Sequence, residues 1–465
     1  MHRFIPLIAV LVLTSACPRR TQYSRPALPV PAAWPENAAG PAAAPGTPAA
    51  AEMKWQEFFT DQRLQSVIEL ALANNRDLRA AALNIERVQT LYRIQLAELY
   101  PTIAATAGGN AYRVPKNLSG KDHAETVAQY TVGLGTAAWE LDLFGRIRSL
   151  KSSVLEQYLA TEQARSATQI SLVAAVAGTY LALAADRENL RLAQVTLDAQ
   201  QSSYELIRRS SQVGIASDLD LREAQTQVDA ARVDIARYSG QAALDEHALN
   251  LLVGAPVPPA LLPDSLAKVG TLKDVAAGLP SDVLLRRPDI LSAEHQLKAA
   301  SANIGVARAA FFPRISLTAA AGITSSDLTN LFKPAAGTWN FAPQAALPIF
   351  DYGTRQAGFK AAEVDRDTAI ATYEKAIQAA FSEVSDALSL RTTLVDQQNA
   401  LQSLVGSLEE TYRLSEARYK GGIDSYLSVL VAQRALYAAQ QQLVGVRLAR
   451  LGNLVTLYKV LGGGA

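Results

Sequence analysis

The second half of the chain repeats the first, and this duplication limits the fold more than any other feature of the sequence. Residues 203–254 align without gaps with residues 411–462, at an offset of 208. A second match at an offset of 212 pairs Pro101 with Pro313. The repeat of about 210 residues is far longer than the 20–50 residues of a solenoid unit. The sequence therefore predicts two similar halves, 60–263 and 264–465, where length alone would suggest three domains.

Each half shows the same order of predicted elements. A first helix is ended by a proline, which cannot continue it. Two strands follow, then a very long helix, a glycine turn and a second long helix. The predicted helices are 64–98, 146–211 and 217–253 in the first half and 281–310, 355–420 and 425–461 in the second. A helix over 146–211 would be roughly 100 Å long, and no compact domain needs such a length.

The predicted strands alternate apolar with polar or small residues. Ile315, Leu317 and Ile323 follow this period of two in one strand, and Trp339 and Phe341 follow it in the next. Runs of about 9–11 residues have the length of a tilted transmembrane strand, although an ordinary half-buried hairpin has the same period. Four strands cannot close a barrel, and an open edge cannot lie in lipid. Spanning strands would therefore require a dimer with eight strands or a trimer with twelve.

The N-terminus has the features of a secretory signal at residues 1–16. A basic start, an apolar run too short to span a membrane and a few small residues precede Cys17, the one cysteine of the chain. The pattern is similar to a bacterial lipobox, in which Cys17 carries acyl chains such as palmitate and becomes the mature N-terminus. A plain signal peptide with an incidental cysteine is the alternative. Residues 17–59 are rich in Pro and Ala and are predicted to form an extended strap.

Composition argues against most other classes of protein. A formal net charge of +1 argues against nucleic-acid binding as the main function. One cysteine and four histidines leave little for a metal site, so no cofactor and no metal are expected. No Ser-His-Asp order or phosphate-binding glycine loop is present, and Glu294-His295 has no obvious partner on its predicted helix. We therefore expect that the protein is not an enzyme.

Four motifs, taken together, resemble one family. They are Trp-Glu-Leu-Asp-Leu-Phe-Gly-Arg at 139–146, Ala-Arg-Ala-Ala-Phe-Phe-Pro-Arg-Ile-Ser-Leu at 307–317, Leu-Pro-Ile-Phe at 347–350 and Tyr-Lys-Val-Leu-Gly-Gly-Gly at 458–464. The sequence resembles the TolC-like outer-membrane factors, and among them the OprM-type lipoproteins of RND multidrug efflux pumps. The resemblance covers nearly the whole mature chain.

The resemblance implies a mixed α and β membrane protein. Three chains, each with four strands, would form a 12-stranded β-barrel in the outer membrane, in contact with its lipid and continued by a long α-helical barrel in the periplasm. The homotrimer would be a passive exit duct for drugs and other small molecules, with a role in antibiotic resistance. A periplasmic adaptor (membrane fusion) protein and an inner-membrane RND transporter are the implied partners, and the transporter would supply the energy.

The two glycine turns are the predicted periplasmic tips. Gly214 and Gly422 can take the left-handed conformation that ends a helix. Ser217 and Ser425 are placed to cap the returning helices, and Asp220 follows Ser217 as in a capping box. Capping could be the whole role of these residues.

The resemblance adds a gate at the tips. In the family a tyrosine of the second tip bonds an aspartate of the first in the closed state, and Tyr419 and Asp220 stand at those positions. Family channels also place acidic residues after the second tip, where this sequence has Ser428 and Val431. Asp424 or Asp218 could replace that acidic ring, or Leu427 and Val431 could form a hydrophobic constriction.

Two alternatives remain beside the efflux channel. A factor for type I protein secretion would share the architecture. A coiled-coil lipoprotein scaffold without a channel would explain the helices but not the four amphipathic strands.

Overall fold

The computed structural model describes residues 23–35, 53–270, 272–273, 275 and 280–463. The predicted signal peptide and Cys17 lie outside the described residues. The chain divides into two compact units, each taken by itself below. Unit 1 comprises Met1–Ala27, Asn84–Thr161 and Ser292–Tyr373, and unit 2 comprises Leu28–Leu83, Glu162–Leu291 and Glu374–Ala465.

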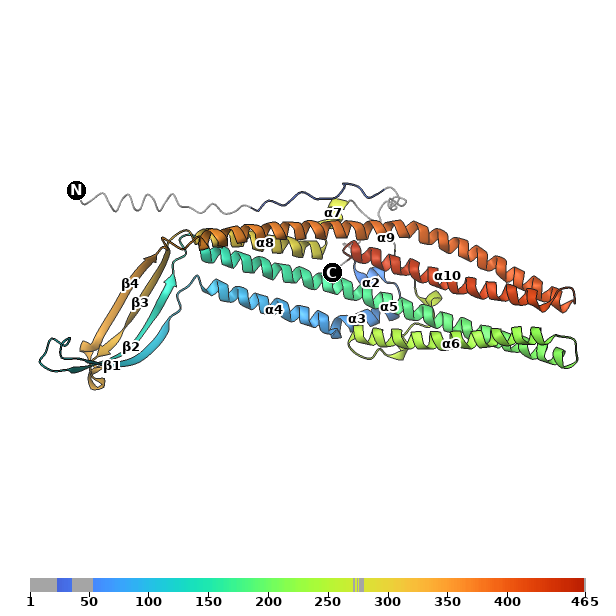
Figure 1. The fold of residues 1–465 in the computed structure, drawn as a ribbon, viewed down its shortest axis with the longest axis horizontal. Helices are drawn as coiled ribbons and strands as arrows, with labels where there is room; N and C mark the ends of the chain where they lie inside the picture. The colour runs from blue at the N-terminus through green and yellow to red at the C-terminus, as the bar shows by residue number, and fades with distance from the viewer. Residues whose placement is uncertain (1–22, 36–52, 271, 274, 276–279, 464–465) are drawn as a thin grey trace. The chain divides into compact units, whose positions relative to one another are not determined.

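The order of elements is the same in the two halves (Figure 1). The helices are α2 (Trp55–Phe58), α3 (Gln62–Asn74), α4 (Arg76–Ala97), α5 (Arg146–Gln212), α6 (Asp218–Val253), α7 (Pro280–Leu284), α8 (Pro288–Ala309), α9 (Thr354–Lys420) and α10 (Tyr426–Val460). The strands are β1 (Ala104–Val114), β2 (Glu125–Glu140), β3 (Arg314–Ser325) and β4 (Gly337–Ala346). Short 3-10 turns lie at Pro259–Leu261, Leu266–Lys268, Leu328–Asn330 and Pro334–Ala336.

The four long helices end within a residue of their predicted bounds, but the prediction of one continuous first helix in each half is wrong. In the first half Asn75 separates α3 from α4, because its side-chain oxygen accepts the Leu78 N–H at 2.8 Å and so caps α4. In the second half α8 starts afresh at Pro288, a residue suited to the first turn of a helix and not to its interior.

The predicted first helix of each half is broken, at Asn75 and at Arg287, and the hydrogen bonds at these breaks show that the duplication extends to single contacts. The Asn75 side chain donates to the carbonyl of Leu252, near the end of α6, at 2.8 Å. The Arg287 guanidinium donates to the carbonyl of Val460, at the end of α10, at 2.9 Å. These donors and acceptors are equivalent at the two offsets of the sequence repeat. The two repeats therefore form the same contact, between a helix break and the end of the last helix, with different side chains.

In unit 1 the four strands form one antiparallel sheet in the order β1-β2-β3-β4 (Figure 1). Strands β2 and β3, from different halves, pair at its centre. Their backbones approach closely at Gly322, where a Cβ atom would lie 2.2 Å from the carbonyl oxygen of Val132. A bulge between Thr136 and Trp139 interrupts the register, and Ala138 within it has a φ of 52°.

Neither face of this sheet is covered by the rest of the described chain. Every residue of β4, and every residue of β1 except Val114, is exposed. Trp339 is 78% exposed and Phe341 60% exposed, and both lie on the same side of β4. The outer edges of β1 and β4 have no strand partner among the described residues. Such a sheet is incomplete in a single chain.

Two of the family motifs meet where the strands of unit 1 join its helices. The rings of Phe144 and Phe312 stack with centroids 4.8 Å apart. Beside them Glu140 accepts hydrogen bonds from Arg146, at 2.8 Å, and from Arg314, at 2.6 Å. These two motifs thus supply aromatic packing and ion pairs at the base of the sheet.

The predicted strap lacks regular structure over residues 23–35. The prediction that it stays extended to residue 59 is wrong at its end, where α2 forms. The expectation that Glu294 and His295 lack partners is also wrong. Arg25 donates to Glu294 at 2.8 Å, and His295 lies 2.7 Å from Glu156. Sequence reasoning missed these pairs because their members are far apart in the chain.

In unit 2 the helices share one hydrophobic core, which we call the main core. It includes residues of α3, Leu172–Ala185 of α5, the end of α6, Val444–Val460 of α10 and Leu461, which follows α10. Val176, Tyr180 and Leu183, spaced four and three residues apart on one face of α5, are completely buried. By length and composition α5 could cross a membrane, but half of its apolar stretch is buried against other helices, as expected for close helix packing.

Candidate functional site: the helix-hairpin tips

Two long helix hairpins in unit 2, α5–α6 and α9–α10, end in equivalent glycine turns (Figure 1). Gly214 has a φ of 76° and Gly422 a φ of 68°, as predicted for left-handed turn residues. The turns are closed by matching bonds, from Ile215 N–H to the Ser210 carbonyl at 2.8 Å and from Ile423 N–H to the Arg418 carbonyl at 3.0 Å.

The first tip has the predicted capping box. Ser217 is the N-cap of α6, and its Oγ accepts the Asp220 N–H at 3.1 Å. The Asp220 carboxylate in turn accepts the Ser217 N–H at 3.0 Å and the Ser217 hydroxyl at 2.7 Å. Asp218, at the first position of α6, is exposed. This tip is held by its own short-range bonds.

The second tip is closed in a different way. Ser425 stands at the N-cap of α10, as predicted, but its side chain makes no capping bond. Instead Arg418 donates to the Asp424 carboxylate at 3.0 Å across the turn, and this bond lowers the pKa of Asp424. Asp424 therefore stays ionised but is neutralised by its arginine, which makes it a poor member of a ring of repelling carboxylates.

A small apolar cluster joins the two tips, and we call it the tip cluster. It contains Ile207 of α5, Ala224 of α6, and Tyr426, Val429 and Leu430 of α10. Tyr419 packs on its border, with its ring centroid 5.3 Å from that of Tyr426. The hydroxyl of Tyr419 has no hydrogen bond to Asp220 among the described residues of this one chain.

The opposite face of α10 is exposed. Leu427 is 50% exposed and Val431 58% exposed, and Ser428 lies exposed beside them. Three and four residues apart, these side chains share one helix face. No acidic side chain belongs to this face of the described α10 at that level, so it suits a hydrophobic constriction better than an acidic one.

Sequence reasoning missed a polar contact between the hairpins. The hydroxyl of Tyr437, on α10, donates to Asp234, on α6, at 2.9 Å. These residues are not equivalent in the two repeats, so the duplication gave no sign of the pair. A second link between the hairpins joins Arg447 of α10 to Glu188 of α5 at 3.8 Å.

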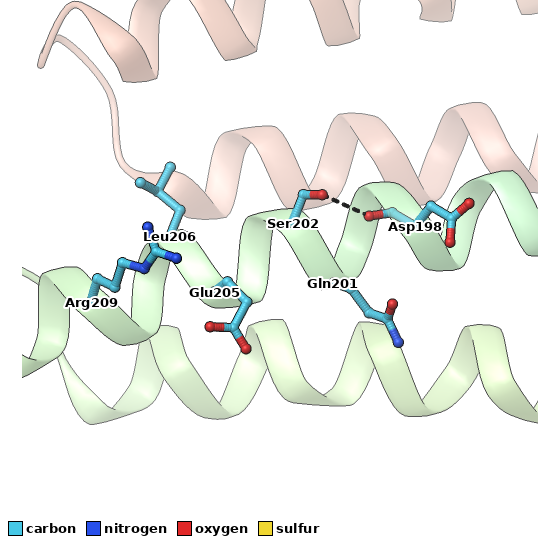
Figure 2. A pocket seen from close by; sticks show the side chains of 6 residues that line it. All are labelled: Asp198, Gln201, Ser202, Glu205, Leu206 and Arg209. Carbon is cyan, nitrogen blue, oxygen red and sulfur yellow. Dashed lines mark hydrogen bonds between the residues drawn. The ribbon is translucent and has the colours of Figure 1, made fainter.

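One hollow of unit 2 lies along a single helix. A depression of about 600 Å³ is lined by six residues of α5 alone, Asp198, Gln201, Ser202, Glu205, Leu206 and Arg209. Figure 2 shows that Glu205 and Gln201 point away from Leu206, and the one bond drawn runs from the Ser202 hydroxyl to the Asp198 carbonyl, at 2.9 Å. Among the described residues no cluster of His, Cys, Asp and Glu is arranged to hold a metal ion.

The geometry defines a class of protein. A sheet with bare faces and open edges, made of strands of membrane-spanning length, belongs to an outer-membrane barrel that several chains complete. Long helix hairpins that end in glycine turns follow its strands along the chain. No enzyme-like site accompanies them in the described residues. These are the parts of a channel subunit.

Comparison with known proteins gives the family. The model of the outer membrane efflux protein family matches this chain twice, at residues 67–255 and 279–463. The chain therefore belongs to that family of outer-membrane efflux channels, which is not a family of enzymes. The double match agrees with the internal duplication.

Relatives and solved structures agree with this assignment. The chain is 48% identical to the probable efflux pump outer membrane protein TtgC of Pseudomonas putida KT2440, over 99% of this chain and 95% of that one. It has the same identity and coverage with the antibiotic efflux pump outer membrane protein ArpC of Pseudomonas putida. Among solved structures, the open state of the MtrE outer membrane channel of Neisseria gonorrhoeae superimposes with a TM-score of 0.88 and 37% identity, covering 96% of this chain and 98% of that chain.

Proposed function

We propose that three copies of this chain form the outer-membrane exit duct of a tripartite efflux pump. The open sheet edges carry this proposal. Strands β1 and β4 point in opposite directions, because all neighbours in the sheet are antiparallel. The edge strand β4 of one chain can therefore pair antiparallel with β1 of the next. Three sheets joined in this way close a 12-stranded barrel with no edge left in lipid.

Transport through this duct is passive, and other proteins supply the energy. We propose that a proton-coupled inner-membrane transporter of the RND type supplies the driving force. A periplasmic adaptor would connect that transporter to the helix-hairpin tips. The name of the relative ArpC points to antibiotics as a substrate class. In this proposal Cys17 carries acyl chains that hold the N-terminus at the membrane.

The gate of the duct lies at the tips. Tyr419 and Asp220 are proposed to bond in the closed state, between hairpins brought together in the trimer. Asp220 already has a partner in Ser217 at 2.7 Å, so the phenol would add to that bond and not replace it. Leu427 and Val431 would form an apolar ring, with Ser428 beside them. Asp218, exposed next to Asp220, adds negative charge near the entrance.

Conductance of the purified protein in planar lipid bilayers tests both the duct and its gate. We expect discrete single channels from the wild type and a higher open probability, about tenfold, from Tyr419→Phe, because one hydrogen bond to a carboxylate is lost. Tyr204→Phe, a tyrosine on the border of the same tip cluster, is the matched control. A heat-modifiable trimer with no conductance would contradict the channel and favour a scaffold.

A deletion strain separates drug efflux from type I protein secretion. Loss of an efflux duct should lower the inhibitory concentrations of several unrelated antibiotics at least fourfold and leave the secreted proteins unchanged. The reverse result, an altered set of secreted proteins with unchanged drug susceptibility, would favour secretion. Complementation with the wild-type gene is the control.

A further inference from the structure

The two helix hairpins of unit 2 touch along a seam that changes character along its length. The main core joins them at one end, through α5 and α10. The tip cluster of Ile207, Ala224, Tyr426, Val429 and Leu430 joins them at the other. Between these two apolar contacts, a hydrogen bond and an ion pair also link the hairpins, and a groove of about 550 Å³ lies between α5, α9 and α10.

The best-formed of these links is the bond between Tyr437 and Asp234. The hydroxyl of Tyr437 lies 2.9 Å from Oδ2 of Asp234, and the amide of Gln441, one turn further along α10, lies 3.5 Å from the same oxygen. The other carboxylate oxygen is paired with Arg237 of the same helix at 2.9 Å. The side chain of Asp234 is only 20% exposed. A hydrogen bond to a half-buried carboxylate is among the stronger kinds in proteins.

This bond can break without leaving a buried charge unpaired. Arg237 lies on α6 itself and would stay with Asp234 if α10 moved away. Burial and the nearby carboxylate raise the pKa of Tyr437, so the phenol keeps its proton and can return as a donor. The contact therefore has the properties of a reversible link.

The same stretch of the seam contains buried hydrogen-bond acceptors that have no donor in this arrangement. The side-chain oxygens of Gln200 on α5 and Gln433 on α10 are buried and have no hydrogen-bond partner among the described residues. A buried acceptor without a partner destabilises the arrangement that contains it. Between its two packed ends the seam thus contains a groove and two buried amide oxygens without a partner, and the Tyr437–Asp234 hydrogen bond is shorter than the Arg447–Glu188 link.

We propose that the Asp234–Tyr437 hydrogen bond is a latch that joins the two hairpins and must open before the tips can spread. Asp234 and Tyr437 are then positioning residues for gating, placed about 16 Å along α10 from Tyr426 of the tip cluster. The inference rests on the proposed gated duct and adds a control point to it. Once the latch opens, the small tip cluster and the 3.8 Å link between Arg447 and Glu188 are the remaining described contacts between the hairpins beyond the main core.

Single-channel recording on the full-length protein tests the latch. Tyr437→Phe and Asp234→Ala should each raise the open probability about tenfold, and the double variant should do no more than either alone, because both remove the same bond. Tyr437→Lys returns a donor of similar reach and should bring the open probability back towards the wild-type value. Tyr238→Phe is the control, since the Tyr238 ring faces Arg237 of its own helix at 4.6 Å.

The outcomes separate the latch from the proposed function. All variants are first checked for a heat-modifiable trimer band, so that only folded channels are recorded. Suppose that Tyr419→Phe raises the open probability and the latch variants leave it unchanged. The latch hypothesis would then be wrong, and the proposed duct would still hold. Additive effects of Tyr437→Phe and Asp234→Ala, or no return with Tyr437→Lys, would also overturn the latch, because the residues would then act separately. A wild type that does not conduct would overturn the duct itself.

Discussion

Glu294 holds the N-terminal segment to the helices of unit 1. Its side chain is only 3% exposed, and both of its oxygens are bonded by the Arg25 guanidinium. Lys298 lies 3.2 Å away on the same helix, and the Tyr23 hydroxyl donates at 3.1 Å. A buried carboxylate with this many donors is stable only while they are present, so the segment around Arg25 is held by charge more than by apolar contact.

We expect Glu294→Gln to lower the stability of unit 1 by about 2 kcal/mol, because the amide leaves Arg25 without its counter-charge. Burial favours the neutral acid, but the bonds from Arg25 and Lys298 outweigh it and lower the pKa of Glu294. The stabilisation is therefore complete above the ordinary glutamate pKa of about 4.3 and is lost as pH falls through the lowered value.

Thermal unfolding of wild type and Glu294→Gln at a series of pH values measures this effect. The difference in melting temperature should be full at pH 7 and should shrink below about pH 4. Glu410→Gln is the control, because Glu410 pairs with Arg413 while 54% exposed and should contribute little. Equal melting temperatures at pH 7 would show that Glu294 does not stabilise the segment.

At this scale the sequence predicted local chemistry well and distant pairs poorly. The Ser217–Asp220 capping box follows from a spacing of three residues, and the structure confirms it. Arg25 and Glu294 are 269 residues apart, so the local sequence around either residue does not predict that the two form a pair. The pair of Asp234 and Tyr437 was hidden for the same reason, and its two residues are not related by the repeat.

Among the elements, the sheet depends most on what lies outside the chain. Strand β4 has Trp339 and Phe341 on one side and Thr338, Asn340 and Gln344 on the other. One side is thus suited to lipid and the other to a water-filled lumen. Strand β4 ends at Ala346, two residues before Pro348, which lacks the N–H that strand pairing needs.

We expect Phe341→Arg to impair insertion, because an arginine facing the middle of the bilayer costs about 2–4 kcal/mol. Asn340→Arg, one residue away on the other side of β4, should be tolerated. The amount of heat-modifiable trimer in outer-membrane fractions compares the two. If Asn340→Arg proves the more harmful, the lipid and lumen sides of the sheet are the reverse of those assigned here.

For the whole molecule, the duplication was visible in sequence because Gly214 and Gly422 stand at the same offset as the residues around them. The structure extends it to the pairs Asn75–Leu252 and Arg287–Val460. The break at Asn75 could not be predicted, since a polar residue inside a helical pattern is compatible with a continuous helix, whereas Pro288 could have indicated the break in the second half. In both halves the residue at the break also bonds to the last turn of another helix.

The barrel, and not the lipid, should be the main anchor of the whole protein. We expect Cys17→Ser to abolish acylation and to leave the amount of trimer within about twofold of the wild type, because a closed barrel is held in the bilayer far more firmly than one or two acyl chains can hold a protein. Mass spectrometry of the N-terminal peptide and the trimer band measure the two effects. Loss of the trimer in Cys17→Ser would assign the lipid a role in assembly.

The central pairing of β2 with β3 has a consequence for how such a barrel comes together. It joins a strand of the first repeat to a strand of the second, and the proposed pairing of β4 with the next chain's β1 does the same. An ancestor with one repeat per chain could thus have closed the same ring from six copies. Fusion of two copies turned three of the six encounters between separate chains into events within one chain. Assembly then falls from a sixth-order to a third-order dependence on concentration, which favours closure when the chain is scarce.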